Sequence, residues 1–176
     1  MEKIIKQYRD NKELMIPMII LVALIGKIAL HFILPEKYYY DNYRILATVV
    51  DPDYKLAWKG SYEVAADFFR KIDIFGFTQL YQWSIFLGVI FNSLLVALFS
   101  RSKGLDNKQS IFLLMCVGIL NIYIFTIGKD AIQVLIFILL FIVIQVQIIP
   151  NWLKIPLCFG ILYWESTFFR NYYVLL

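Results

Sequence analysis

The sequence predicts an all-α integral membrane protein with about five transmembrane helices. Of its 176 residues, 61% are hydrophobic and 18% are aromatic, and the mean hydropathy is +0.69. Soluble domains contain roughly 45–50% apolar residues, so a water-soluble fold of this length lacks the interior to bury so many. The apolar residues also form continuous stretches long enough to cross a bilayer, which takes about 20 helical residues.

Five apolar stretches have this length, and each is expected to be a spanning helix. They cover residues 14–34, 80–100, 110–127, 131–149 and 153–176. The charged first 13 residues precede a run long enough to span, so no cleavable signal peptide is expected. We therefore expect residues 1–176 to form a single membrane domain, with one sizeable connecting segment at 35–79.

The orientation follows from the excess of lysine and arginine that marks cytoplasmic loops. With five spans, the basic clusters all fall on one side: Lys3, Lys6, Arg9, Lys12, Arg101, Lys103, Lys108 and Lys154. The N-terminus is then cytoplasmic in a multi-pass protein of the plasma membrane. Segment 35–79, the turn at Lys129–Asp130 and the Arg170 end of the last span lie on the outer side.

Segment 35–79 is expected to carry a short amphipathic helix. It opens with the tyrosine-rich run "PEKYYYDNYR", and "DPD" at 51–53 predicts a turn. In "SYEVAADFFRKIDIFGF" the apolar residues recur at helical spacing, with Ser61 as the expected cap: Tyr62, Ala65, Ala66, Phe69 and Ile72. This helix is predicted to lie at the outer membrane interface.

The stretch "FTIGKDAI" places a lysine and an aspartate between two apolar runs. Gly128 is a plausible helix stop. Asp130 is expected at or near the N-terminus of the next helix, where a carboxylate meets the positive end of the helix dipole. Lys129 is then free to point towards lipid headgroups or into a cavity.

Ionisable residues inside spans are functional candidates, because an unpaired charge in lipid is costly. Lys27 and His31 share one helix face; Lys27 either snorkels outward or lines an outward-facing cavity. Glu165 must be protonated or paired, with Lys27 or Lys129 as candidate partners. Arg170, between aromatic residues, is either an interface anchor or a clamp for phosphate or pyrophosphate.

Arg70 and Lys71 on the amphipathic helix either face headgroups or cover a site lined by Lys129 and Arg170. Polar residues within the spans are predicted to hydrogen-bond between helices: Asn92, Ser93, Asn121, Gln133, Gln145 and Gln147. Cations gathered on the outer side of a positive-inside protein suggest an anionic ligand in the outer leaflet. A lipid-linked sugar pyrophosphate is such a ligand.

Other chemistries find little support in the sequence. Cys116 and Cys158 lie in apolar runs and are expected to be buried small side chains, and a single histidine excludes a histidine-rich metal site. Nucleotide-binding and metalloprotease motifs are absent from the sequence. We expect no metal, no cofactor and no nucleic-acid partner.

"FTIGKDAIQVLIFILLF" and "ESTFFRNYYVLL", placed after a tyrosine-rich outer loop, resemble bacterial polysaccharide polymerases of the Wzy type, which make capsule, exopolysaccharide and O-antigen chains. That family often has a lysine–aspartate turn between two spans. It also often has an arginine followed by tyrosines near the outer end of the next span. The matching residues here are Lys129, Asp130, Arg170, Tyr172 and Tyr173.

The resemblance implies transfer of a growing glycan from undecaprenyl pyrophosphate to a new lipid-linked repeat unit, at the outer leaflet of the bacterial cytoplasmic membrane. It implies that cations bind the pyrophosphate and glycan with Tyr172, and that Glu165 or His31 acts as acid or base. The implied cations are Arg170, Lys129, Arg70 and Lys71. Asp130 would organise the turn. The implied partners are a lipid-linked oligosaccharide, membrane lipids and other polysaccharide-assembly proteins.

Members of this family have about twice as many spans, so the resemblance covers the N-terminal portion of a typical member and implies a partial polymerase. Two alternatives stay open. One is a small non-enzymatic membrane protein, such as an accessory subunit, an immunity protein or a transporter component. The other is a different lipid-sugar glycosyltransferase, with Asp41, Asp51 or Asp53 as the acidic residue of the first outer loop.

Overall fold

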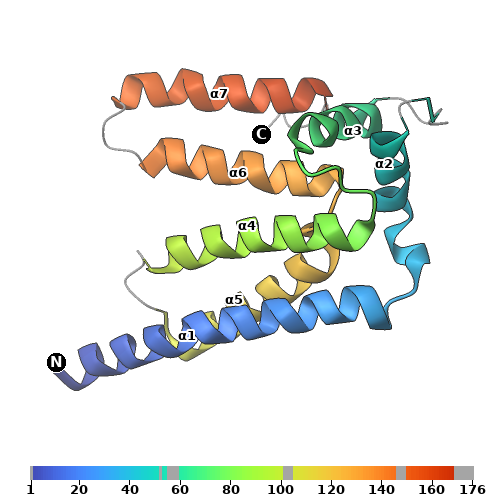
Figure 1. Ribbon diagram of the computed structural model, residues 1–176. Helices are drawn as coiled ribbons and strands as arrows, with labels where there is room; N and C mark the ends of the chain where they lie inside the picture. The colour runs from blue at the N-terminus through green and yellow to red at the C-terminus, as the bar shows by residue number, and fades with distance from the viewer. Residues whose placement is uncertain (1, 52, 55–59, 101–104, 146–149, 169–176) are drawn as a thin grey trace. The chain divides into compact units, whose positions relative to one another are not determined.

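The computed structural model describes residues 2–51, 53–54, 60–100, 105–145 and 150–168, and all regular secondary structure in these ranges is helical (Figure 1). The long helices are α1 (Glu2–Ile28), α4 (Leu80–Ser100), α5 (Asn107–Ile119), α6 (Lys129–Gln145) and α7 (Asn151–Phe168). Shorter elements are the π-helical turns η1 (Ala29–Ile33) and η3 (Leu120–Ile124), the 3₁₀ turn η2 (Glu36–Tyr39), and helices α2 (Tyr40–Val50) and α3 (Ser61–Ile72).

Three of the described helical segments are long and apolar enough to cross a membrane: Glu13–Ile33, Leu80–Ser100 and Asn107–Ile124. They match the first three predicted spans closely. Helices α6 and α7 correspond to the fourth and fifth predicted stretches. The described part of neither helix is both as long and as apolar as the three spans. The number of five spans therefore stays a prediction.

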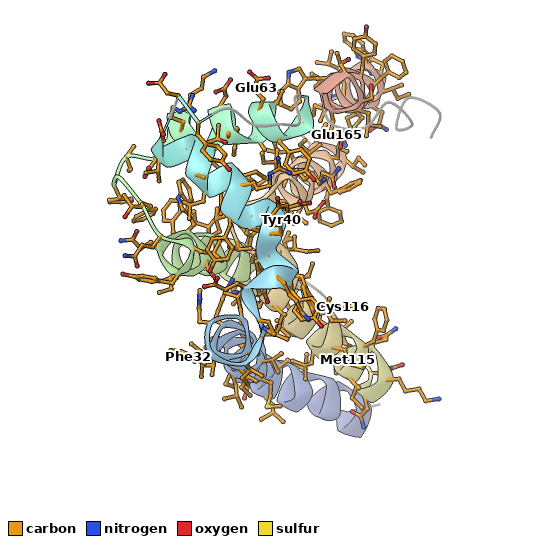
Figure 2. The ribbon with its side chains drawn as sticks, turned by 90° about the vertical axis from the view of Figure 1, so that its right-hand side faces the viewer. Phe32, Tyr40, Glu63, Met115, Cys116 and Glu165 are labelled. Atoms are coloured by element: carbon orange, nitrogen blue, oxygen red, sulfur yellow. The ribbon has the colours of Figure 1, made fainter. Side chains whose placement is uncertain are left out.

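Large apolar side chains project from the three spans. Phe32 is 84% exposed and Met115 is 62% exposed, and both stand away from the ribbon in Figure 2. Contiguous apolar surface of this kind marks contact with lipid or protein rather than with water. The exposed side chains agree with the membrane assignment made from hydropathy.

The third span ends earlier than expected. The prediction extended it to residue 127, whereas the helix widens into a π turn and ends at Ile124, with the Phe125 amide donating to the Leu120 carbonyl at 2.8 Å. Residues 125–128 form buried bends before α6 begins. A similar π turn closes α1, where the Leu34 amide donates to the Ala29 carbonyl at 3.0 Å. π turns of this kind often occur at functional sites.

The chain divides into two compact units. The first unit comprises residues 1–40 and 79–126, and the second comprises residues 41–78 and 127–176. In the first unit α1 packs against α4 and α5, running antiparallel to α4 and parallel to α5 (Figure 1). Its apolar core contains Met15, Ile19, Ala23, Phe99 and Val117.

Small residues let the helices of the first unit approach closely. A Cβ atom added to Gly26 of α1 would lie 2.9 Å from the Cβ of Asn121 and 3.3 Å from the carbonyl oxygen of Gly118. Beside this contact, the amides of Asn92 and Asn121 exchange hydrogen bonds of 2.8 and 2.9 Å. The prediction that these two residues hydrogen-bond between helices is confirmed.

In the second unit, α6 packs antiparallel against α7 and also contacts α3 (Figure 1). Helix α3 is amphipathic as predicted: Ala65, Ala66 and Phe69 are fully buried, while Glu63 points away from the helix (Figure 2). The expected cap was wrong, because Ser61 is the first helical residue and the N-cap is Gly60, with a φ of 95° and no side-chain hydrogen bond. Only glycine adopts this backbone conformation readily.

Helix α2 was not predicted. The tyrosine-rich run was treated as a loop, but Ile45, Leu46 and Val49 are buried on one side of a regular helix. The turn after it was predicted correctly: the Asp53 amide donates to the Asp51 carboxylate at 3.0 Å, and the Tyr54 amide donates to the Asp51 carbonyl at 3.1 Å. The connecting segment is therefore largely helical and not an extended loop.

Candidate functional site

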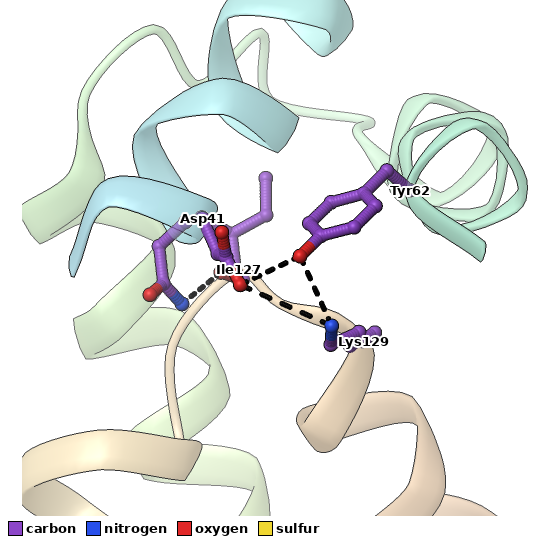
Figure 3. Close-up of polar contacts among 5 residues, drawn as sticks. Asp41, Tyr62, Ile127 and Lys129 are labelled. Atoms are coloured by element: carbon purple, nitrogen blue, oxygen red, sulfur yellow. Dashed lines mark hydrogen bonds and ion pairs between the residues drawn. The ribbon is translucent and has the colours of Figure 1, made fainter. Parts of the chain in front are cut away.

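A cluster of three polar side chains in the second unit joins α2, α3 and α6 (Figure 3). The hydroxyl of Tyr62 donates to the Asp41 carboxylate at 2.7 Å and accepts from the Lys129 ammonium at 3.1 Å. Lys129 Nζ also lies 3.9 Å from the Asp41 carboxylate and 4.4 Å from the centre of the Tyr62 ring. Each member thus contacts the other two.

Local structure explains why these residues meet. Asp41 is in the first turn of α2, Tyr62 is the second residue of α3, and Lys129 is the first residue of α6. The side-chain amide of Asn42 donates to the Ile127 carbonyl, which ties the start of α2 to the bend before α6 (Figure 3). The contact between α3 and α6 brings in Tyr62.

The cluster combines a fixed cation with an accessible carboxylate. The Lys129 side chain is 24% exposed and the Asp41 side chain is 52% exposed. The aromatic face and the hydroxyl of Tyr62 hold the ammonium in place, because a cation is attracted to the negative face of the ring. One of the three N–H donors of Lys129 goes to Tyr62. The arrangement can bind an anion at Lys129 and accept a proton at Asp41.

A second pair of polar residues continues from this cluster along α6. Gln133 lies one helical turn after Lys129 and therefore on the same face. Its amide donates to the Glu165 carboxylate of α7 at 3.4 Å, and Glu165 is only 2% exposed. Asp41, Tyr62, Lys129, Gln133 and Glu165 thus form a polar stripe, as we call this set below. Two of the predicted site residues, Lys129 and Glu165, belong to it.

The structure gives Lys129 and Glu165 different partners from those considered in the sequence. Lys129 pairs with Asp41 and Tyr62, and Glu165 contacts Gln133. Gln133 lies about 6 Å from Lys129 along the α6 axis, since it follows Lys129 by four residues and each residue rises about 1.5 Å. The partner of the buried acid is therefore one helical turn from the candidate cation on α6.

The basic residues of α3 lie away from Lys129. Arg70 pairs with Asp67 at 2.9 Å and donates to the Thr48 carbonyl at 2.7 Å. Arg70 and Lys71 lie in the last turn of α3, about 12 Å along the helix axis from Tyr62. Arg70 thus fastens α3 to α2, and Lys71 is exposed at the helix end.

His31 and Lys27 belong to the first unit. The ring of His31 lies edge-on to Tyr81, with 6.4 Å between ring centres, and among the described residues its Nε2 atom has no hydrogen-bond partner. Lys27 donates to the carbonyl of Phe125. Lys27 thus lies in the last turn of α1 and His31 in η1, and the two side chains contact different residues.

Asp130 is in the first turn of α6, as predicted for a carboxylate near a helix N-terminus. Arg170, Tyr172 and Tyr173 lie outside the described residues. Cys116 and Cys158 are free thiols, and both are partly exposed instead of buried, because each lies on a helix whose surface is apolar. Within the described ranges, His, Cys, Asp and Glu residues do not gather in threes as a metal site would need.

Sequence reasoning missed Tyr62 and Asn42 as site residues. Tyr62 was assigned to the apolar face of α3. Its hydroxyl, in the first turn of that helix, instead makes polar contacts with Asp41 and Lys129. Asp41 was considered only for the alternative glycosyltransferase. The signal that could have found them is their place at helix starts, where a polar side chain meets the ends of neighbouring helices.

No protein-family model, curated protein or solved structure matches the chain. The resemblance to polysaccharide polymerases stays a prediction from short motifs. The case for a function therefore depends on the geometry of the polar stripe and on the apolar helices around it.

Proposed function

We propose that the chain is a membrane-embedded glycosyltransferase of the polysaccharide polymerase type, or the N-terminal portion of one. The observation that carries the proposal is the polar stripe, which places a fixed cation, Lys129, next to a half-exposed carboxylate, Asp41. A reaction whose leaving group is a lipid pyrophosphate needs both groups: a cation for the departing charge and a base for the acceptor hydroxyl.

In this proposal α6 and α7 join the three apolar spans as the fourth and fifth spans of a multi-pass protein in the bacterial cytoplasmic membrane. The N-terminus is cytoplasmic, in keeping with its excess of lysine and arginine. Helices α2 and α3 and the start of α6 then lie at the outer face. Lys129 would meet a lipid-linked oligosaccharide at the level of the headgroups.

The proposed reaction is a displacement at the anomeric carbon that joins the growing glycan to its lipid pyrophosphate. The hydroxyl oxygen of an acceptor repeat unit forms the new glycosidic bond, and the bond to the pyrophosphate oxygen breaks. The pyrophosphate leaves with the bonding electrons and is held by Lys129. The hydroxyl proton passes to Asp41, whose carboxylate is half exposed, while the buried Glu165 orients the stripe through Gln133.

The family resemblance adds Arg170 and Tyr172 as further ligands of the pyrophosphate and the glycan. Arginine suits this role because its guanidinium offers forked, permanently charged donors. His31 remains a candidate acid or base from the sequence. The expected partners are the lipid-linked oligosaccharide, membrane lipids and other proteins of polysaccharide assembly.

The test replaces Lys129 with methionine in the host that makes the chain, and measures the length distribution of its surface glycan on gels. Removing a charge-stabilising donor of this kind typically lowers a rate by about 100-fold or more. We therefore expect long polymer to be replaced by single repeat units at an unchanged protein level. Lys154→Met is the matched control, because Lys154 donates to the Ile144 carbonyl elsewhere in the same unit.

Long polymer retained in Lys129→Met would remove Lys129 from the proposed mechanism. Equal loss in Lys129→Met and Lys154→Met would point to a general effect of lost positive charge. The small non-enzymatic membrane protein is the second candidate function, since the polar groups of Asp41, Tyr62 and Lys129 satisfy one another within the chain. It predicts a normal glycan in both variants.

A further inference from the structure

An apolar groove of about 520 Å³ runs between α1 and α4 in the first unit. Its lining is almost entirely aliphatic or small, and includes Ile20, Leu24, Lys27, Ile85, Val89 and Ala97. Ligand pockets in proteins typically enclose about 300–1,000 Å³, so the groove is large enough for part of a lipid.

The length of the groove matches one leaflet of a bilayer. Along α4 it extends from Ile85 to Ala97, which is about 18 Å at a rise of about 1.5 Å per residue. Half of a hydrocarbon core that is about 30 Å thick is about 15 Å. Both walls belong to segments long and apolar enough to span. An extended hydrocarbon chain therefore fits the groove in both length and chemistry.

Lys27 is the one lining residue with a charged side chain. Its stem lies over Gly88, where an added Cβ would be 2.7 Å from Lys27 Cε and 3.4 Å from Nζ. Its ammonium donates to the carbonyl of Phe125, the residue after the third span. The ammonium thus lies beside Gly88, about 12 Å along α4 from Leu80, and the flexible lysine stem can extend outward from there towards a lipid headgroup.

The first unit supplies no nearby counter-ion for this lysine. The sequence has no aspartate or glutamate at 14–35, 80–105 or 107–128. These ranges contain the three spans except for Glu13, the first residue of the first span. Among the described residues, Lys27 takes part in no ion pair. Lys27 has a backbone carbonyl as a hydrogen-bond partner and no carboxylate from these spans, so its charge favours an anionic lipid group over a neutral one.

We propose that the α1–α4 groove binds one hydrocarbon chain of an anionic phospholipid, whose phosphate pairs with Lys27. The site belongs to the first unit and shares no residue with the polar stripe. It does not depend on the proposed glycosyltransferase activity.

The test is native mass spectrometry of the purified full chain in detergent, with added phosphatidylglycerol or phosphatidylcholine of identical chains. Wild-type protein is expected to retain phosphatidylglycerol preferentially. Lys27→Met should reduce this preference roughly fivefold, in line with the contribution of one lysine to binding at an anionic membrane surface. Phosphatidylcholine binding should be nearly unchanged, because the apolar walls remain.

A second pair of variants tests the groove itself. Val89 is 62% exposed on the groove wall, so Val89→Trp should fill the groove without disturbing the core and lower the binding of both lipids. Ile111→Trp on α5 is the matched control, because Ile111 is 61% exposed and does not line the groove. An unchanged headgroup preference in Lys27→Met would overturn the phosphate contact. Equal lipid binding in Val89→Trp and Ile111→Trp would overturn the groove as the binding site.

Discussion

Lys27 in the first unit and Lys129 in the second are both next to long apolar helices, but their surroundings differ in kind. Lys27 lies against a glycine and donates to a backbone carbonyl. Lys129 contacts an aromatic hydroxyl and a carboxylate. In the first unit the lysine is thus held by a backbone atom between helices, whereas the second unit gathers acidic, basic and phenolic groups where its helices begin.

The same contrast holds for packing. In the first unit Gly26 sits where a Cβ would collide with Asn121 and approach Gly118. In the second unit Gly160 of α7 has no heavy atom within 4 Å of the place where a Cβ would be. Gly26 thus allows a close helix contact in the first unit, whereas Gly160 of the second unit faces open space. Three substitution experiments test this difference between the units.

The largest effect is expected for Gly26→Ala. Overpacking a close helix contact typically costs about 1–3 kcal/mol, because neighbouring backbone must move. We expect the thermal unfolding temperature in detergent to fall. Gly160→Ala is the matched control: alanine favours a helix over glycine by about 0.5–1 kcal/mol, so this variant should be slightly more stable. A loss of stability that is equal in both variants would contradict the contrast in packing.

A smaller effect is expected at the amide pair. Asn92→Leu removes the donor to Asn121, a side chain with 0% exposure, and should cost about 1–2 kcal/mol because a buried carbonyl loses its partner. Adding Asn121→Leu replaces both polar groups with apolar ones of similar size. The double variant should recover much of the loss, as measured by chemical unfolding in mixed micelles.

The comparison for the second unit is the ion pair between Arg70 and Asp67, whose side chains are 37% and 55% exposed. An exposed pair typically contributes about 0.2–1 kcal/mol, so Asp67→Asn should cost less than Asn92→Leu. If the amide pair proved no more costly to break than this ion pair, the polar contacts of the two units would be equivalent.

The sequence predicted the elements in which one property dominates. Continuous apolar runs located the three spans to within a few residues, and the spacing of Ala65, Ala66 and Phe69 located α3. Helix α2 was missed because tyrosines hid its shorter apolar face, which Ile45, Leu46 and Val49 form. The end of the third span was missed because a π turn depends on backbone hydrogen bonds that leave no mark in hydropathy.

The site was predicted less completely than the fold. Lys129 and Glu165 were chosen because a charge in an apolar stretch needs an explanation, and both belong to the polar stripe. The prediction that Gln133 hydrogen-bonds between helices is confirmed by its bond to Glu165. The pairing itself was not predicted, and neither was Tyr62, which a periodic pattern assigns to the apolar face of α3. Which polar groups meet is decided by how α2, α3, α6 and α7 pack, and hydropathy and periodicity do not show that packing.

The last effect is a pH dependence at Tyr39, which is absent at neutral pH. Its side chain is 2% exposed and stacks on Tyr123, and its hydroxyl donates to the Ile122 carbonyl at 3.1 Å. Burial, with a contribution from Tyr123, raises the pKa of Tyr39 from 10.0 to about 12. Between pH 10 and 12 the unfolded chain loses the phenolic proton of Tyr39 while the folded chain keeps it. The contribution of the protonated phenol to the free energy of unfolding is therefore complete below pH 10 and is lost as the pH rises towards 12.

Tyr39→Phe removes this titration along with one hydrogen bond. The variant should therefore be less stable than wild type by a constant amount up to about pH 9. The difference should then narrow by about 1 kcal/mol at pH 10.5, since each unit of pKa corresponds to about 1.4 kcal/mol. Unfolding of both proteins in detergent from pH 8 to 10.5 measures the change. A constant difference over the whole range would mean that Tyr39 ionises as easily in the folded first unit as in the unfolded chain, and that this contact is open to water like those of the second unit.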